Sequence, residues 1–346
     1  MGDWIFTAIE QVITLWPAVL VAVVAGIAGL KYGADWMVEG SSGMGLRLGM
    51  SPVLVGLILV AFGTSAPELV VSIMTANRGQ PEISLGNVIG SNIANSTIIL
   101  GLTAIIFPLA IKSSSYKKDA PLGFGAILLA MLMAWHGHLL SRLDGLVLLF
   151  LFSSWMIWTF RKVLFKKDQA EALTGEETPP LAEMKHGAAG DAAYMAVGLV
   201  GLVIGADLLV AGAVATARAL DIPDVVVGLT VVAGGTSLPE LAVCMVAAFK
   251  KRGEITVGNV LGSNIFNAML ILGVVSVLAP MGFDVVPGSF EGDHGTLYLD
   301  FPLVVGISAL LIPLMAHKQK LGRLKGAFLV SLYLAYIAFL VWRELT

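Results

Sequence analysis

Two glutamates in the middle of long apolar stretches are the first residues in this sequence to suggest chemistry. Glu68 lies in the stretch 52–77 and Glu240 in the stretch 224–249, and neither stretch carries Lys or Arg away from its ends. A carboxylate in such surroundings is costly unless it is solvated or paired. We therefore expect a mobile cation, either a metal ion or a proton, to neutralise these groups. The alternative is a pair of protonated carboxyls with a structural role.

A proline stands directly before each glutamate, at positions 67 and 239, and each is preceded by Gly-Thr-Ser, at 63–65 and 235–237. Proline removes one helix hydrogen bond and clashes with the carbonyl four residues earlier. We expect the helix to unwind here and to turn backbone carbonyls toward a cavity, where irregular backbone is tolerated inside a membrane. The alternative is a simple packing kink.

A second motif supplies neutral oxygens, GNVIGSNIAN at 86–95 and GNVLGSNIFN at 258–267. Its hydroxyls and amides form i, i+4 pairs that share one helix face, Ser91 with Asn95 and Ser263 with Asn267. Asn87 and Asn259 lie on an adjoining face and could instead bond the broken backbone. The glycines permit close helix contact. Carboxylates, carbonyls, amides and hydroxyls, without imidazole or thiol, form a hard oxygen site that suits Ca²⁺ better than zinc or copper.

Both motifs belong to an internal repeat. Residues 55–101 align with 227–273 at a constant offset of 172, with 26 identities in 47 positions, and the offset extends back to Gly-Ala-Asp at 33–35 and 205–207. Each half of the chain holds five apolar stretches, an odd number, so the two copies must enter the membrane from opposite sides. Inverted repeats with a site at the midplane are typical of secondary transporters.

The elements that must position these residues are membrane helices. Of the 346 residues, 57% are apolar and 13% are charged, compared with about 25% charged in a soluble domain. These values exclude a soluble enzyme and a disordered chain, and no basic patch indicates a nucleic-acid partner. Helical spans need roughly 20 apolar residues each, and outer-membrane barrels show shorter alternating segments. Ten stretches qualify: 12–43, 52–77, 83–108, 121–140, 144–165, 190–219, 224–249, 255–280, 298–316 and 324–343.

The basic residues set the orientation. With the N-terminus outside, 16 of the 21 Lys and Arg residues fall in cytoplasmic loops and 4 fall outside, which the positive-inside rule favours. The prediction is an all-α membrane protein, N-out and C-out, in the inner (plasma) membrane of a prokaryote. Its first half is 1–165, with a repeat at about 52–102, and its second half is 190–346, with a repeat at about 224–274. Residues 166–189 between them form a polar, flexible cytoplasmic linker without a fold of its own.

The paired GTSxPEL and GNxxGSNxxN sequences closely resemble the two alpha-repeats of the Ca²⁺/cation antiporter superfamily, and its Na⁺/Ca²⁺ exchanger branch in particular. The resemblance implies an electrogenic secondary antiporter that exchanges Na⁺ for Ca²⁺ by alternating access. It implies a Ca²⁺ site from Glu68 and Glu240 with the carbonyls of Thr64 and Thr236. It also implies Na⁺ sites from the same glutamates with Ser65, Ser237, Ser91, Ser263 and the carbonyls of Ala61 and Ala233, and a central region completed by Asn95 and Asn267.

Two departures narrow this expectation. Some microbial and potassium-dependent relatives have Asp at the position of Asn267, so its amide argues against potassium dependence. The middle loop of about 24 residues is too short for the Ca²⁺-sensing domain of animal exchangers. Expected partners are Ca²⁺, Na⁺ and the lipid bilayer, with no cofactor, no required protein partner and no enzymatic activity. The alternatives are a cation/proton antiporter on the same scaffold and, in a different class, a cation channel or a non-transporting membrane protein.

Overall fold

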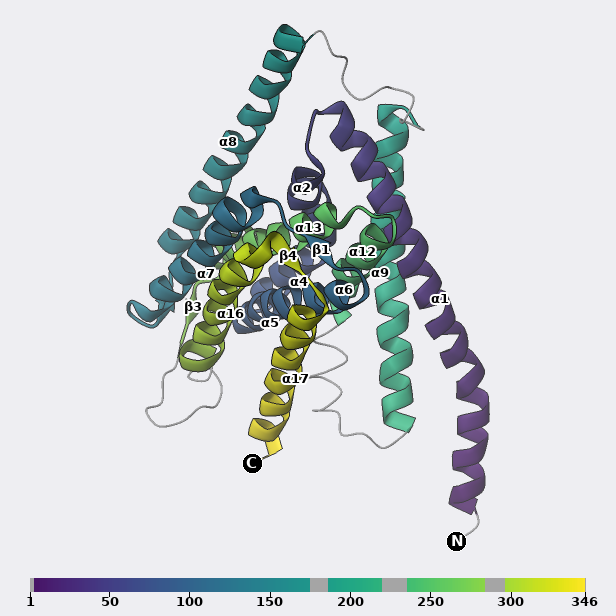
Figure 1. Ribbon diagram of the computed structural model, residues 1–346. Helices are drawn as coiled ribbons and strands as arrows, with labels where there is room; N and C mark the ends of the chain where they lie inside the picture. Colours follow the sequence, from purple (N-terminus) through teal and green to yellow (C-terminus); the bar gives the residue numbers. More distant parts are fainter. Residues whose placement is uncertain (1–2, 175–185, 220–234, 284–295, 346) are drawn as a thin grey trace.

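The computed structural model describes residues 3–174, 186–219, 235–283 and 296–345, and Figure 1 shows a bundle made almost wholly of helices. In these residues eight helices are long and apolar enough to cross a membrane, and the bent pair Pro52–Thr64 and Ala66–Asn77 makes a ninth span. The apolar helix Leu238–Phe249 occupies the position of this pair in the second repeat. The preceding residues 220–234 lie outside the described residues. The all-α membrane class is confirmed.

Five spans come from each half. The first half contains α1 (Asp3–Arg47); α2 (Pro52–Leu54), η1 (Val55–Val60), α3 (Ala61–Thr64) and α4 (Ala66–Asn77); α5 (Pro81–Ala94), η2 (Asn95–Ile99) and α6 (Leu100–Ile106); η3 (Ser115–Asp119) and α7 (Ala120–Trp135); and α8 (Arg142–Thr174). The second half contains α9 (Ala188–Ala219); α12 (Leu238–Phe249); α13 (Gly253–Ile265), η6 (Phe266–Ile271) and α14 (Leu272–Leu278); η7 (Thr296–Asp300), α16 (Phe301–Ala316) and η8 (His317–Gln319); and α17 (Arg323–Leu345).

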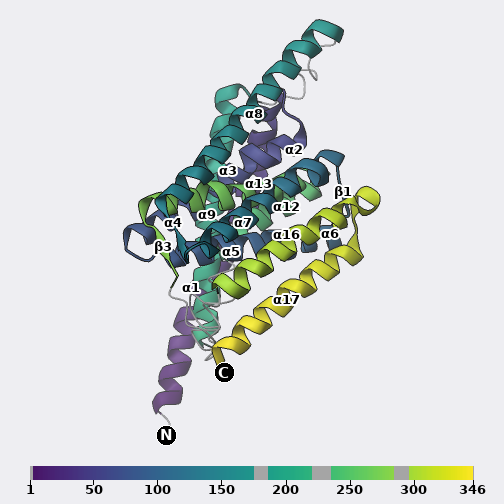
Figure 2. The same ribbon diagram turned by 90° about the vertical axis from the view of Figure 1, so that its left-hand side faces the viewer.

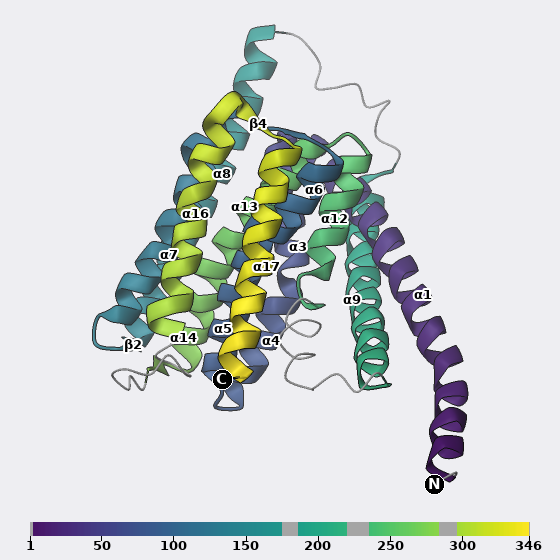
Figure 3. The ribbon, with the colours of Figure 1, turned by 60° about the horizontal axis from the view of Figure 1, so that its bottom comes forward.

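Two short strand ladders show the inversion. Strand β1 (Leu109–Ala110) pairs with β4 (Lys320–Leu321), and β2 (Leu139–Leu140) pairs with β3 (Met281–Gly282). Strands β1 and β3 are 172 residues apart, so the strand that follows the third span of each half pairs with the strand between the fourth and fifth spans of the other half. Figure 3 places β4 near one end of the bundle and β2 at the other. The same pairing therefore recurs at opposite ends, as two inverted repeats require.

Helices α1 and α9 pack along each other at one edge of the bundle (Figure 3). Their contact depends on glycine. A Cβ on Gly33 would lie 2.6 Å from the Leu202 nitrogen, and a Cβ on Gly29 would lie 2.9 Å from the Gly205 Cα. Outward-facing side chains such as Leu20 are exposed, which is the expected state of an apolar group that faces lipid. The two long spans thus form one smooth-faced pair.

Two helix boundaries differ from those expected. Helix α8 continues to Thr174, so residues 166–174 of the expected linker are helical, and Figure 2 shows α8 extending beyond the rest of the bundle. Residues 175–185 lie outside the described residues. The fourth span begins at Ser115 rather than near 121. Lys117 and Lys118 made this segment look like a loop, but both side chains sit at the cytoplasmic end of the span, where long basic side chains can reach the membrane surface.

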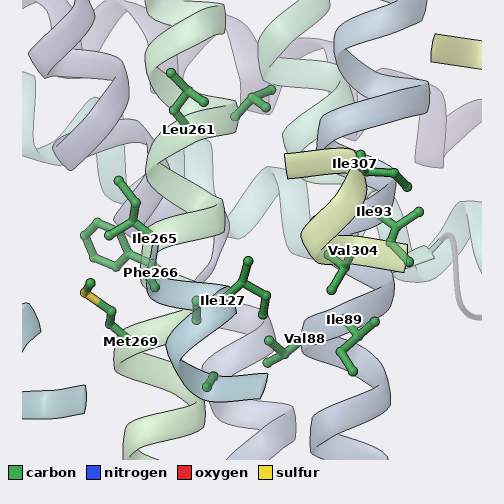
Figure 4. Packing of buried hydrophobic residues seen from close by; sticks show 14 of the residues in the cluster. Val88, Ile89, Ile93, Ile127, Leu261, Ile265, Phe266, Met269, Val304 and Ile307 are labelled. Carbon is green, nitrogen blue, oxygen red and sulfur yellow. The ribbon is translucent and has the colours of Figure 1, made fainter. Parts of the chain in front are cut away.

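The central helices of both repeats pack into one apolar core. Figure 4 shows side chains from α5, α7, α13 and α16 meeting there, among them Ile93, Ile127, Leu261 and Val304. Backbones come close in this region, because a Cβ on Gly258 would lie 2.8 Å from the Leu57 nitrogen. This rigid packing holds the two motif-bearing spans of each repeat against those of the other.

Candidate ion-binding site

The Gly-Thr-Ser-Ala-Pro-Glu segment of the first repeat interrupts its helix as predicted, and in the second repeat α12 begins directly after the equivalent Gly-Thr-Ser. Helix α3 ends at Thr64, α4 begins at Ala66, and the span bends by 41° between them. Ser65 has φ −85° and ψ 1°, and its equivalent Ser237 has φ −91° and ψ 2°. Each proline stands within the first two positions of the following helix, where a missing N–H costs nothing. The interruption is therefore local, and it places each glutamate in the first turn of a new helix.

Both glutamates are deeply buried. Glu68 is 1% exposed and Glu240 is 2% exposed. Among the described residues neither forms an ion pair with Lys, Arg or His. The positive end of a helix dipole favours each carboxylate. Two buried acids without a basic partner among the described residues need a cation or a proton to neutralise them.

The polar atoms around the glutamates form a set of unpartnered oxygens. Eight buried oxygens of the two motifs have no hydrogen-bond partner among the described residues: Ser65 Oγ, Glu68 Oε2, Ser91 Oγ, Asn95 Oδ1, Ser237 Oγ, Glu240 Oε2, Ser263 Oγ and Asn267 Oδ1. They form four pairs at the repeat offset of 172. Buried polar atoms in proteins are almost always satisfied, so each exception needs an explanation. Four are carboxylate or amide acceptors and four are hydroxyls whose lone pairs can also ligate an ion, so the set fits a cation.

A crossed pair of amide hydrogen bonds orients two of these oxygens. The Asn95 amide donates to Asn264 Oδ1 over 3.2 Å, and the equivalent Asn267 amide donates to Asn92 Oδ1 over 3.0 Å. Because each amide nitrogen is used across the repeat interface, the Oδ1 atoms of Asn95 and Asn267 point elsewhere and stay unpartnered. Sequence reasoning gave Asn92 and Asn264 no role, although both stand in the second motif directly after its serine.

The threonines at the breaks make a second crossed pair. Thr64 Oγ1 donates to Asn259 Oδ1 over 3.3 Å, and Thr236 Oγ1 donates to Asn87 Oδ1 over 3.4 Å. The two asparagines were expected to reach the broken backbone, whereas their oxygens accept from the threonine hydroxyls beside it. Each break is thus tied to the second motif of the opposite repeat, and the threonine carbonyls remain separate from this bond.

The expected alanine carbonyls stand apart from this set. Ala61 is fully buried, and its carbonyl accepts the Ser65 amide over 2.9 Å. It therefore has a backbone partner already, unlike the eight oxygens above. Ala233 lies outside the described residues. In the described part of the chain no group of three or more His, Cys, Asp or Glu side chains could hold a metal, so the candidate site combines two carboxylates with neutral oxygens.

Access to the site differs between the two ends of the bundle. A cavity of about 700 Å³ separates α4 from α9 and reaches Pro67, Thr236 and Pro239 beside the glutamates. At the opposite end α1 packs against α12, and Val38 and Val243 there are fully buried. Val71, the repeat equivalent of Val243, is 39% exposed at the cavity. With the N-terminus outside, the cavity lies on the extracellular half of the membrane, so this conformation faces outward.

Comparisons with known proteins agree on one family. The family model described as sodium/calcium exchanger protein matches residues 18–161 and 191–342. The chain belongs to the sodium/calcium exchanger family. It is 32% identical to the putative antiporter CaxA of Alkalimonas amylolytica over 91% of this chain and 96% of that one. It is 30% identical to the sodium/calcium exchanger MaX1 of Methanosarcina acetivorans over 92% and 97% of the two chains.

A solved structure supports the same conclusion. The sodium-calcium exchanger NCX_Mj, soaked with 10 mM Na⁺ and no Ca²⁺, superimposes with a TM-score of 0.75 at 32% identity, over 93% of this chain and 98% of that one. Its fold has ten transmembrane helices, which confirms the predicted span count and topology. The protein is a multi-pass integral membrane protein and a cation antiporter of this family, and it is not an enzyme.

Proposed function

We propose that this antiporter exchanges Na⁺ for Ca²⁺ and that both ions use the oxygens around Glu68 and Glu240. The eight buried, unpartnered oxygens in four symmetric pairs carry the proposal. Ca²⁺ takes six to eight oxygen ligands in flexible geometry and accepts carboxylates, carbonyls and amides together. Two carboxylates balance its charge, and the carbonyls of Thr64 and Thr236 at the helix breaks complete the set.

Na⁺ would occupy the same region in a different arrangement. The serine hydroxyls at 65, 91, 237 and 263 are neutral acceptors beside the glutamates, and they suit a monovalent ion that does not need a second carboxylate. Asn95 and Asn267 would supply amide oxygens at the centre. The Ala61 carbonyl stands about one turn before its break, and Ala233 is its equivalent in the sequence. Because the Na⁺ sites share Glu68 and Glu240 with the Ca²⁺ site, we expect binding of the two ions to be mutually exclusive.

The buried charge explains why transport would be exchange rather than leakage. Without cations the site holds two carboxylates in a low-dielectric interior, and such charges are costly to bury unless they are paired. The change in access is then favourable only with cations bound. Either ion lowers this cost, so Ca²⁺ moves one way only if Na⁺ returns by the same route. We also propose that residues 1–165 and 190–346 form the two five-helix halves of the transporter.

Counterflow in proteoliposomes tests the proposal. Purified protein is reconstituted with Ca²⁺ inside, and Na⁺, K⁺ and proton gradients are imposed one at a time. An inward Na⁺ gradient should drive Ca²⁺ efflux, with no requirement for K⁺. Efflux driven by a proton gradient alone would replace the proposal with cation/proton antiport. Ca²⁺ movement that needs no counter-ion would indicate a conducting pore.

A further inference from the structure

A half-exposed ion pair holds the closed cytoplasmic end together. Lys250 Nζ lies 2.9 Å from Asp35 Oδ1, and it also donates to the Asp35 carbonyl over 3.2 Å. Asp35 is on α1, and Lys250 is the C-cap residue that directly follows α12. The pair therefore joins the α1–α9 pair to the central helices at the end where α1 and α12 are packed.

The repeat places the same charges at the other end of the bundle. Asp207 on α9 is the equivalent of Asp35, and Arg78 at the end of α4 is the equivalent of Lys250. Both turns have the same backbone, since Gly79 has φ +75° and its equivalent Lys251 has φ +58°. Yet no ion pair between described residues involves Asp207 or Arg78. Both are exposed, and Asp207 lines the open cavity.

We propose that Asp35–Lys250 and Asp207–Arg78 are alternative ion pairs that set the balance between the outward-facing and inward-facing states. In the outward state the first pair closes the cytoplasmic end, and the cavity keeps the second pair apart. When α1 and α9 shift together, the first pair separates and the second forms across the closed cavity. Each state is then stabilised by one pair, and the four residues bias access without contacting the transported ion.

Among the described contacts between α1 or α9 and the central helices, the ion pair of Asp35 with Lys250 has charged residues at both repeat-equivalent positions. The bond from Arg252 to Ser42 also joins the cytoplasmic turn to α1, but its repeat equivalents, Gln80 and Val214, cannot form it. The ion pair of Lys112 with Glu254, 2.6 Å long, joins two parts of the central bundle. It is somewhat more exposed than the proposed pair and does not join α1 or α9 to the central helices, which makes it the control.

Two cysteine reporters at repeat-equivalent positions measure the balance. Val210 lines the cavity, whereas Val38 is fully buried at the cytoplasmic end. Val210→Cys and Val38→Cys are made separately in a Cys244→Ser background, which removes the sole cysteine and copies Ser72, its repeat equivalent. A membrane-impermeant maleimide labels the first in right-side-out vesicles and the second in inside-out vesicles, at one fixed salt composition. The ratio of inside to outside labelling rates reports the inward-to-outward population ratio.

The two pairs predict opposite shifts of this ratio. Lys250→Met should raise it and Arg78→Met should lower it, each by about two- to fivefold, the range expected for a partly exposed ion pair. The double variant should return near the starting value, and so should the reversed pair Asp35→Lys with Lys250→Asp. Lys112→Met should leave the ratio unchanged. Shifts in the same direction, or a shift as large in the control, would overturn the proposal. The readout does not depend on which ions are exchanged, so it stands apart from the Na⁺/Ca²⁺ assignment.

Discussion

The centre of the molecule keeps the symmetry of the repeats, while the regions that flank it do not. Around the glutamates the main hydrogen bonds between the motifs have their equivalents. Asn95 to Asn264 matches Asn267 to Asn92, and the bond from Ser84 Oγ to the Ser72 carbonyl matches that from Thr256 Oγ1 to the Cys244 carbonyl. On the flanks, α1 packs against α12, but a cavity separates α9 from α4.

This difference assigns ion binding to the symmetric centre and control of access to the helices on either side of it. A symmetric centre offers the same ligands whichever side is open, so the site need not be rebuilt when access changes. The asymmetry is carried by α1 and α9, whose mutual contact uses glycine backbone and presents smooth faces. Sliding of packed helices is an established type of conformational change. We therefore expect substitutions at the centre to abolish function and substitutions on the flanks to shift its balance.

The largest effect is expected at the centre. Glu68→Gln and Glu240→Gln keep the side-chain shape and remove one charge each from a site whose cation has no other ionic partner. Each should reduce Na⁺-driven Ca²⁺ flux by at least about a hundredfold, since the loss of a buried charge–charge contact costs about 3–5 kcal/mol. Flux in proteoliposomes and elution as a folded monodisperse protein are measured together. Near-normal flux in either variant would contradict the central role of these carboxylates.

The second prediction concerns the contact between α1 and α12 at the closed cytoplasmic end. Val38 and Val243 belong to the same buried cluster between α1 and α12, whereas their equivalents Val210 and Val71 line the cavity. In the Cys244→Ser background, a Val38→Cys/Val243→Cys pair should be cross-linked readily by oxidation and should lose roughly nine-tenths of its flux, because α1 can no longer slide. A reducing agent should restore flux. The Val210→Cys/Val71→Cys pair is the control, with slower cross-linking in the outward state.

A cross-linked protein that still turns over would contradict the sliding of α1 and α9. It would leave the ion site untouched, because the glutamates and their unpartnered oxygens do not depend on this contact. The result would then direct attention to a smaller movement of α4 or α12 alone.

The sequence predicted the centre better than its surroundings. The repeat, the breaks and the buried glutamates follow from local rules: proline position, the cost of an unpaired carboxylate and a fixed offset. The role of Asn92 and Asn264 could not be predicted, because it depends on hydrogen bonds between the two repeats. Neither motif alone shows which asparagine of the other repeat is the partner. The early start of the fourth span at Ser115 was missed because Lys117 and Lys118 look like loop residues without a membrane surface for reference.

The outward-facing state could not be predicted either. A sequence with two equivalent halves is compatible with either end being open, and the choice depends on small differences in packing. Val71 and Val243 are the same residue at equivalent positions, yet one is 39% exposed and the other is fully buried. Such a difference depends on the conformation, and the residue types at the two positions do not reveal it.

A third prediction compares Asn264 with Asn92, the two asparagines that accept the crossed amides, because their further hydrogen bonds differ between the repeats. Asn264 accepts from Asn95 and also donates to Ser96 over 2.8 Å. The equivalent of Ser96 is Ala268, so the Asn92 amide donates instead to the Asn264 carbonyl over a longer 3.4 Å. Asn264→Ala should therefore raise the ion concentration needed for half-maximal flux by about tenfold, the cost of one orphaned buried amide. Asn92→Ala should raise it less. Maximal flux should change little, because neither side chain is a proposed ligand. Equal effects, or a loss of maximal flux alone, would contradict the positioning role.

The smallest expected effect is on voltage, and it depends on the neutrality of the amides at the centre. With both glutamates ionised, one Ca²⁺ or two Na⁺ balance the site, because Asn95 and Asn267 add no charge. A third Na⁺ would leave the loaded site at +1, so each cycle would carry one net positive charge inward as Ca²⁺ leaves. Moving that charge through 100 mV is worth about 2.3 kcal/mol. Part of this energy falls on the rate-limiting step, so an inside-negative potential clamped by an ionophore should speed Ca²⁺ extrusion severalfold. Asn267→Asp is the matched variant: a third carboxylate balances the third Na⁺, and the voltage dependence of the Na⁺-loaded step should fall. A wild-type rate indifferent to voltage, with two Na⁺ moved per Ca²⁺, would show that the centre holds only as many charges as its two glutamates balance.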